Sequence, residues 1–217
     1  MTNETHERYI NALNISEKQE GIFLRPLSKT VIKAKVWDAS SGWNHSIYGT
    51  YDIYFIKNEQ GIYVGSILDM GIQDLHVFIK QEYRKQGHLT RALKEYVLPY
   101  LFSHGRAYQK ITYKDEIARQ HALKFGFKEI EEGKGRISKK MLGPIIVNDG
   151  QNIPLSETEY NNMKEKISHA IGLLKMAQDQ VEMAYHNGGQ FNSAIQSITK
   201  MLNRVEDIYL RENQENS

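Results

Sequence analysis

The sequence contains no cysteine. Disulfide bonds, cysteine nucleophiles and cysteine-ligated metal sites are therefore excluded, and the lack of disulfides fits an intracellular protein. The histidines and carboxylates do not occur at the spacing of a metal-ligand set, so we predict no metal.

Long hydrophobic runs are also missing. No stretch approaches the roughly 20 apolar residues that a membrane-spanning helix needs. The polar residues 1–20 lack the apolar core of a signal peptide, and we expect them to form a loose or partly helical lead-in. We therefore expect a cytoplasmic protein that does not enter a membrane.

The sequence also has little excess of positive over negative charge. The chain of 217 residues has a formal net charge of +2, with 40% hydrophobic and 25% charged residues, as expected for a folded globular protein. Residues 151–217 contain 6 Lys and Arg against 9 Asp and Glu, which leaves 22 against 17 in the remainder of the chain. The basic first region suits an anionic ligand, but neither region is basic enough to indicate nucleic acid.

Short runs of β-branched and aromatic residues alternate with helical patterns in the first 145 residues. They predict strands at residues 21–27, 51–56, 62–68, 74–79 and 109–113, followed by a hairpin around 133–135. Helices are predicted from Gly87 onward, where Pro99 should kink or end the helix, and at residues 115–125. Residues 28–50 are expected to be helical or irregular, ending in a loop with Trp37, Trp43 and Tyr48 as aromatic anchors. This order predicts an α/β fold of the α+β kind with a mixed sheet.

The last part of the chain has a different pattern. Residues 146–155 are a predicted linker, and residues 156–212 predict an antiparallel helical hairpin that begins with a capping box at Ser156 and Glu159. Apolar residues follow at alternating spacings of three and four. Because two helices alone seldom bury enough surface, we expect the hairpin to pack on the first domain, on a second copy of the chain or on a partner protein.

The segment LHVFIKQEYRKQGHLTRALKEYV is the most informative about chemistry, since a strand runs into a glycine turn and then a helix. Free backbone N–H groups at a helix start, the positive end of the helix dipole and nearby cations together favour a pyrophosphate. Gly87 permits close approach of a ligand to the backbone.

The run Arg84-Lys85-Gln86-Gly87-His88-Leu89 resembles the acetyl-CoA signature of the Gcn5-related (GNAT) N-acetyltransferase superfamily, Arg/Gln-x-x-Gly-x-Gly/Ala, with leucine in place of the final small residue. Residues 118–127 resemble a second family segment, and the resemblance covers residues 21–142 in the family's order. It implies a GNAT acyl-CoA N-acyltransferase fold over residues 21–145, to which the helical hairpin is an addition. The implied activity is transfer of an acetyl group from acetyl-CoA to an amine acceptor by direct attack.

The resemblance also implies which residues bind acetyl-CoA. The backbone of the 74–79 strand would hold the pantetheine arm where this strand splays from the strand at 109–113, and the glycine turn would hold the pyrophosphate. Asp115 lies near the pantetheine arm by the same resemblance, and its simpler interpretation is a helix N-cap. The implied cofactor-binding residues are Val77, Phe78, Ile79, Arg84, Lys85, Gln86, Gly87, His88, Leu89, Thr90 and Asp115.

The catalytic residues are less well marked. The family's usual base positions hold Gln73 and Leu75 here, and neither side chain can accept a proton from an amine. Asp74 and His76 are the candidate bases if a bulge turns the strand, although a solvent-facing polar residue is the simpler interpretation. Tyr113 is the candidate acid, with a core tyrosine as its alternative.

The family's acid position holds Ala122. With the altered base positions, this substitution motivates a second hypothesis, in which the domain binds an acyl-CoA or a partner protein without turnover.

Overall fold

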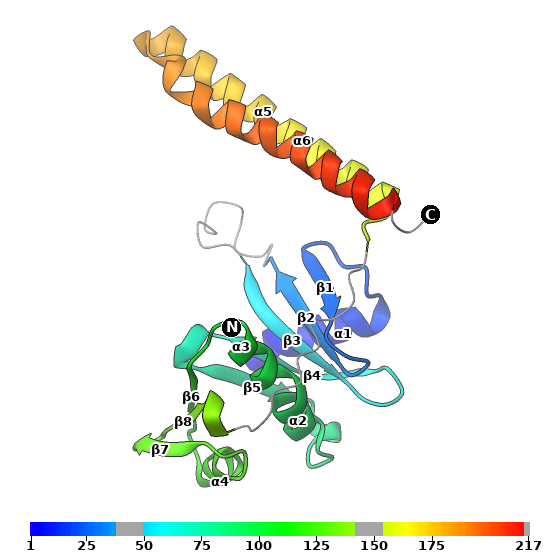
Figure 1. Ribbon diagram of the computed structural model, residues 1–217, viewed down its shortest axis with the longest axis vertical. Helices are drawn as coiled ribbons and strands as arrows, with labels where there is room; N and C mark the ends of the chain where they lie inside the picture. Colours follow the sequence, from blue (N-terminus) through cyan, green and yellow to red (C-terminus); the bar gives the residue numbers. More distant parts are fainter. Residues whose placement is uncertain (38–49, 142–153, 215–217) are drawn as a thin grey trace. The chain divides into compact units, whose positions relative to one another are not determined.

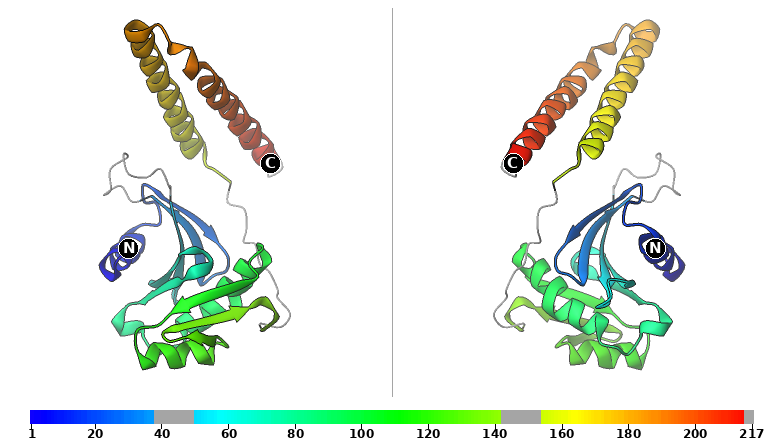
Figure 2. Two further views of the ribbon diagram at one scale, coloured as in Figure 1. Left: turned by 90° about the vertical axis from the view of Figure 1, so that its left-hand side faces the viewer. Right: turned by 90° about the vertical axis from the view of Figure 1, so that its right-hand side faces the viewer.

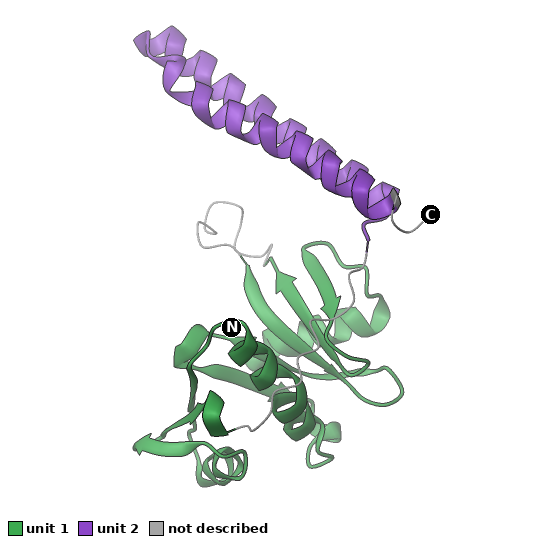
Figure 3. Ribbon diagram, viewed as in Figure 1, with its two compact units in different colours: residues 1–151 green, residues 152–217 purple. Residues whose placement is uncertain are grey.

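The computed structural model describes residues 1–37, 50–141 and 154–214, and the chain forms two compact units, Met1–Gln151 and Asn152–Ser217 (Figure 3). The division falls within the predicted linker. Trp43, Tyr48 and most of the predicted linker lie outside the described residues.

The first unit contains a five-stranded antiparallel sheet in the order β1-β2-β3-β4-β5 (Figure 1). Its strands are β1 (Ile22–Pro26), β2 (Val31–Val36), β3 (Tyr51–Lys57), β4 (Tyr63–Asp69) and β5 (Leu75–Ile79). The expectation of a helical or irregular segment from residue 28 is wrong at β2. The sequence VIKAKV alternates, so that Ile32, Ala34 and Val36 face one core, a strand pattern of period two.

A smaller antiparallel sheet follows, in the order β6-β8-β7. Its strands are β6 (Tyr108–Thr112), β7 (Lys128–Glu131) and β8 (Lys134–Ser138), with α4 (Glu116–Lys124) between β6 and β7. The fold is thus α+β, but the mixed sheet predicted from the sequence is wrong. Every pair of described strands is antiparallel, because β5 and β6 lie in separate sheets instead of forming a parallel ladder.

Helix α1 (Asn3–Ile15) covers one face of the five-stranded sheet (Figures 1 and 2). The side chain of Thr2 caps its first turn by accepting from the Thr5 N–H. Tyr9, Ile10 and Leu13 are buried against the sheet at helical spacing. The partly helical alternative for residues 1–20 is therefore confirmed, and residues 3–15 form a helix that belongs to the core of the first unit instead of a loose lead-in.

A continuous helical run covers the opposite face of the sheet. It consists of α2 (His88–Arg91), the π-helical η4 (Ala92–Val97) and α3 (Leu98–Ser103). Pro99 does not end this run. The Leu98 N–H donates to the carbonyl of Leu93, five residues earlier, so the helix has already widened where Pro99 lacks an N–H of its own.

Strand alternation divides the apolar residues between two cores. In β3, Ile53 and Phe55 pack with α1, whereas Tyr54 and Ile56 pack with the helical run on the other face. The smaller sheet contributes Ile137 to this second core. The first unit is therefore a layered structure, with the five-stranded sheet between α1 and the helical run (Figure 2).

The second unit is a helical hairpin of α5 (Glu157–Tyr185) and α6 (Asn192–Gln214), joined by η6 (Gly188–Phe191). Short 3-10 segments among the described residues of the first unit are η2 (Gly71–Gln73), η3 (Gln81–Tyr83) and η5 (Lys139–Met141). The capping box of Ser156 and Glu159 is confirmed, and the rings of Tyr160 and Tyr209 stack with centroids 4.1 Å apart. The hairpin predicted from the sequence is therefore correct.

Candidate functional site

Strand β5 forms one edge of the five-stranded sheet. Its register pairs Ile79 with Gly65, and the Lys80 N–H donates to the Val64 carbonyl at 3.0 Å. Hydrogen-bonded and non-hydrogen-bonded pairs alternate along an antiparallel ladder, so the backbone N–H and C=O groups of Val77 and Ile79 point away from β4. No described strand pairs with this edge, which leaves the N–H and C=O groups of Val77 and the N–H of Ile79 for an extended ligand, whereas the Ile79 carbonyl accepts from Arg84.

The free edge leads into a tight loop before the helical run. Lys85 and Gly87 both have a positive φ, 62° and 82°, and Gly87 is the N-cap residue of α2. A Cβ atom added at Gly87 would meet nothing within 4 Å, so the space beside its backbone is open. The helix starts immediately after Gly87, since the Arg91 N–H donates to its carbonyl at 3.0 Å.

The side chains of this loop are placed differently from one another. Arg84 donates from Nε to the Ile79 carbonyl at 3.1 Å and so ties the loop to the end of β5. Leu89 is half-buried and packs against the core. Lys85 is exposed, so its ammonium group is accessible to an anion.

The first residues of the helical run complete this geometry. The backbone N–H groups of His88, Leu89 and Thr90 lie in its first turn, where no intrahelical acceptor exists for them. Gln86 Oε1 accepts a hydrogen bond from the His88 ring nitrogen Nε2 at 3.2 Å, which holds these two side chains together. Backbone N–H groups at a helix start can hold an anion.

Asp74 joins β5 to the smaller sheet. Its Oδ1 accepts from the Leu75 N–H at 2.9 Å and from the Thr112 N–H at 2.8 Å. This carboxylate is thus held by two backbone donors at the point where β6 meets the beginning of β5. Asp74 was a candidate base, and these bonds account for its position without a catalytic role.

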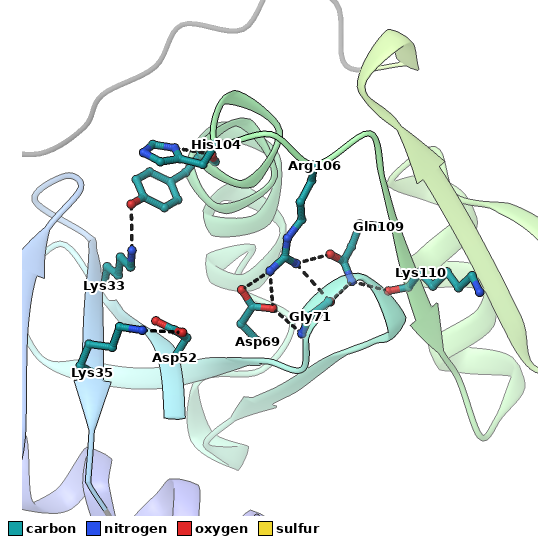
Figure 4. A network of polar contacts seen from close by, with 10 residues as sticks. Lys33, Lys35, Asp52, Asp69, Gly71, His104, Arg106, Gln109 and Lys110 are labelled. Atoms are coloured by element: carbon teal, nitrogen blue, oxygen red, sulfur yellow. Dashed lines mark hydrogen bonds and ion pairs between the residues drawn. The ribbon is translucent and has the colours of Figure 1, made fainter. Parts of the chain in front are cut away.

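A second link between the sheets lies at the preceding turn (Figure 4). Arg106 donates to both carboxylate oxygens of Asp69, at 2.8 and 2.6 Å, and Gln109 donates to the Gly71 carbonyl at 3.0 Å. These bonds join β6 and the residue Arg106 before it to the end of β4 and to η2, whereas the bonds of Asp74 join the end of β6 to the start of β5.

His76 lies on the α1 face of β5. Leu75, Val77 and Ile79 pack with the helical run, as the strand alternation predicted, so His76 is directed to the other side. Its ring stacks on His6 at 5.1 Å and pairs with Asn3 Oδ1 at 3.2 Å. Burial lowers the pKa of His76, which keeps this imidazole neutral at pH 7.

Tyr113 is nearly buried and donates from its hydroxyl to Glu129 at 2.9 Å. Arg119 donates to the same carboxylate and lowers the pKa of Glu129. Burial and the Glu129 carboxylate raise the pKa of Tyr113, so its phenol stays protonated at neutral pH. Sequence reasoning identified Tyr113 but missed Glu129, because no local pattern links the two residues.

Asp115 accepts from the Ala118 N–H at 2.7 Å and is the N-cap of α4. The capping interpretation of this residue is therefore confirmed.

A buried imidazole that the sequence did not single out lies under α1. His6 is fully buried, and its Nδ1 hydrogen-bonds Ser66 Oγ at 2.7 Å, while its Nε2 has no hydrogen-bond partner. Burial, followed by the nearby His76, lowers the pKa of His6 to about 4. The one signal for this residue was its place on the apolar stripe of α1.

Among residues 1–37, 50–141 and 154–214, no group of three or more His, Cys, Asp or Glu is arranged to hold a metal ion. None of the helices formed by these residues has both the length and the apolar character to cross a membrane. Comparison of the chain with models of protein families, with curated proteins and with solved structures gave no match.

Proposed function

We propose that the first unit is an acyl-CoA-dependent N-acetyltransferase of the GNAT type, which transfers an acetyl group from acetyl-CoA to an amine of a small molecule or a protein. One observation carries the proposal: the backbone edge of β5 at Val77 and Ile79 leads through the loop of residues 80–86 into a helical run that begins after Gly87. An extended amide-bearing arm that ends in a pyrophosphate needs this combination, since the edge offers backbone pairing and the helix start offers N–H groups.

Each part of acetyl-CoA has a place in this proposal. The pantetheine arm pairs with the backbone edge of Val77, Phe78 and Ile79, where only alternate residues present their N–H and C=O groups. The pyrophosphate lies against the N–H groups after Gly87, and Lys85 adds a positive charge. Asp115, the N-cap of α4, is the last residue of the expected cofactor site, and its place near the pantetheine arm rests on the family resemblance.

The reaction is direct attack on the thioester. The amine nitrogen forms a bond to the carbonyl carbon, the C–S bond breaks, and the thiolate of CoA takes up a proton. Tyr113 supplies that proton in our proposal, since its phenol is protonated at neutral pH. Asp74 and His76 stay candidates for the base. Because both side chains are already hydrogen-bonded within the fold, the alternative is that the amine loses its proton to water.

Binding is tested by calorimetry with acetyl-CoA on wild type, Gly87→Ala and Gly61→Ala. Both glycines have φ of 82° and open space around an added Cβ, so the two substitutions impose similar backbone strain. Gly87→Ala should weaken acetyl-CoA binding at least tenfold, which corresponds to about 1.4 kcal/mol of binding free energy. Gly61→Ala, in the turn between β3 and β4, should leave the affinity unchanged. Equal effects of both substitutions, or no binding by wild type, would refute the proposed cofactor site.

Turnover is tested by release of free thiol from acetyl-CoA in the presence of a panel of amines. Tyr113→Phe should lower the rate of release without weakening acetyl-CoA binding. The second candidate function is an acyl-CoA-binding module without turnover. It is motivated by Asp74 and His76, because the bonds of Asp74 to backbone N–H groups and of His76 to α1 explain both residues without a catalytic role. Binding without thiol release on any acceptor would establish that alternative.

A further inference from the structure

The helical hairpin buries little of its own apolar surface. Tyr160 is the one buried residue among the described residues of α5, and none is buried in the described part of α6. The residues along the seam between the helices are only half-buried, and they are Met163, Ile167, Ala170, Leu174, Ala177, Val181, Phe191, Ile195, Ile198, Leu202, Val205 and Tyr209. A pair of helices therefore leaves this seam open along its length.

A second row of apolar residues lies beside the seam on each helix. In α5, Leu173 and Met176 directly precede the seam residues Leu174 and Ala177, and they are 49% and 62% exposed. In α6, Met201 directly precedes Leu202 and is 58% exposed. These exposed side chains have no structural role within the hairpin.

The two rows lie on the same side of the hairpin. A residue one position before a seam residue is rotated by about 100° from the seam around the helix. When two antiparallel helices turn their seams toward each other, this rotation moves both rows to the same side. The hairpin register agrees, since Gln178 bonds to Asn192 at 2.8 Å and Lys164 lies 3.5 Å from Glu206. We call this side, with Leu173, Met176, Met183, Ala194 and Met201, the methionine face.

The methionine face carries no charge where it is widest. In the second half of α5 the charged residues Lys175, Asp179 and Glu182 follow one another at helical spacing, on a row away from Leu173 and Met176. The net negative charge of the hairpin is therefore displaced from the face. Like-charge repulsion therefore does not oppose contact where these apolar residues lie, whereas Lys166 and Arg204, which directly precede the seam residues Ile167 and Val205, bring positive charge to the other end of the face.

We propose that the methionine face binds the methionine face of a second copy of this chain, so that two hairpins form a four-helix bundle. A hairpin with helices of 29 and 23 residues presents a side of roughly 40 Å by 20 Å, about 800 Å², from helix rise and diameter. A stable interface buries about 800 Å² on each partner. A second hairpin supplies two helices with the same row of apolar residues, which closes the seam and gives a two-fold dimer.

The proposal is tested on the full chain by sedimentation velocity over a range of protein concentrations. Wild type should sediment as a dimer. The double variant Met176→Glu/Met201→Glu should raise the dissociation constant by about a hundredfold or more, because each interface would bury charges without partners. Both methionines are largely exposed, so circular dichroism should show unchanged helicity.

Leu210→Glu is the matched control. Leu210 is 51% exposed and follows the seam residue Tyr209, which places it on the opposite side of the hairpin. This variant should remain dimeric. A wild type that stays monomeric at every concentration, a double variant that still dimerises, or equal dissociation by Leu210→Glu would overturn the proposal.

Discussion

Acidification is expected to destabilise the first unit through His6. This imidazole is fully buried between α1 and the sheet, with one ring nitrogen on Ser66 and the other without a hydrogen-bond partner. A proton added to the ring would place a positive charge in the core beside His76, which stacks on it at 5.1 Å. In the unfolded chain the imidazole is exposed to water, so protonation does not carry this free-energy cost and occurs at a higher pH.

The magnitude follows from the two pKa values. The pKa of His6 is about 4 in the folded protein, against an ordinary value of 6.5. Between these values the unfolded state binds more protons than the native state, so stability falls as the pH falls. The full effect is about 3 kcal/mol below pH 4, and about 2 kcal/mol of the free energy of unfolding is lost between pH 7 and pH 5.

Other groups near His6 also titrate. Burial lowers the pKa of His76, which adds a loss of the same sign, whereas the Asp74 carboxylate raises it. The positive N-terminus acts in the same direction as burial on both histidines. The contribution of His6 must therefore be isolated by comparison with a variant that cannot titrate at this position.

His6→Phe is the appropriate comparison, because a phenyl ring keeps the stacking on His76 and Phe78 but binds no proton. Urea unfolding at pH 7 and pH 5 should show that wild type loses about 2 kcal/mol more than the variant. Tryptophan fluorescence is a suitable probe, since both tryptophans, Trp37 and Trp43, precede the second unit. Equal pH dependence in the two proteins would refute the reasoning.

Four further substitutions test the contacts that stabilise each unit internally. Arg106→Ala should lower the free energy of unfolding in urea by about 3 kcal/mol, because it leaves the Asp69 carboxylate, 8% exposed, without its cation. The control Lys35→Ala, which removes an exposed ion pair, should lower it by under about 1 kcal/mol. Gly65→Ala should destabilise the first unit by about 1–3 kcal/mol, because its Cβ would lie 2.7 Å from a backbone oxygen of β5, and a melting temperature equal to wild type would contradict that contact. Ser156→Ala should cost the hairpin about 1 kcal/mol by removing an N-cap, measured as lost helicity on heating, and an unchanged curve would mean that the capping box contributes nothing.

Features that depend on near neighbours could be predicted from the sequence. The stripe along α5, the capping box at Ser156 and the glycine at the start of α2 each involve residues within a few positions of one another. Helical periodicity and cap chemistry depend on residues close together in the sequence, so they can be predicted without knowledge of the fold. The β2 strand was missed because the short sequence VIKAKV has too few residues to separate period two from a helical pattern.

The contacts that define the candidate site were decided by tertiary structure. Asp74 bonds to a backbone N–H 38 residues away, His6 to a side chain 60 residues away and Tyr113 to a carboxylate 16 residues away. Spacing along the chain carries no information on such pairs, because only the packing of α1 and the two sheets brings them together. The sequence by itself therefore determined the hairpin and the glycine turn, while the protonation of His6 and the surroundings of each candidate catalytic residue depend on burial, which exists only in the folded chain.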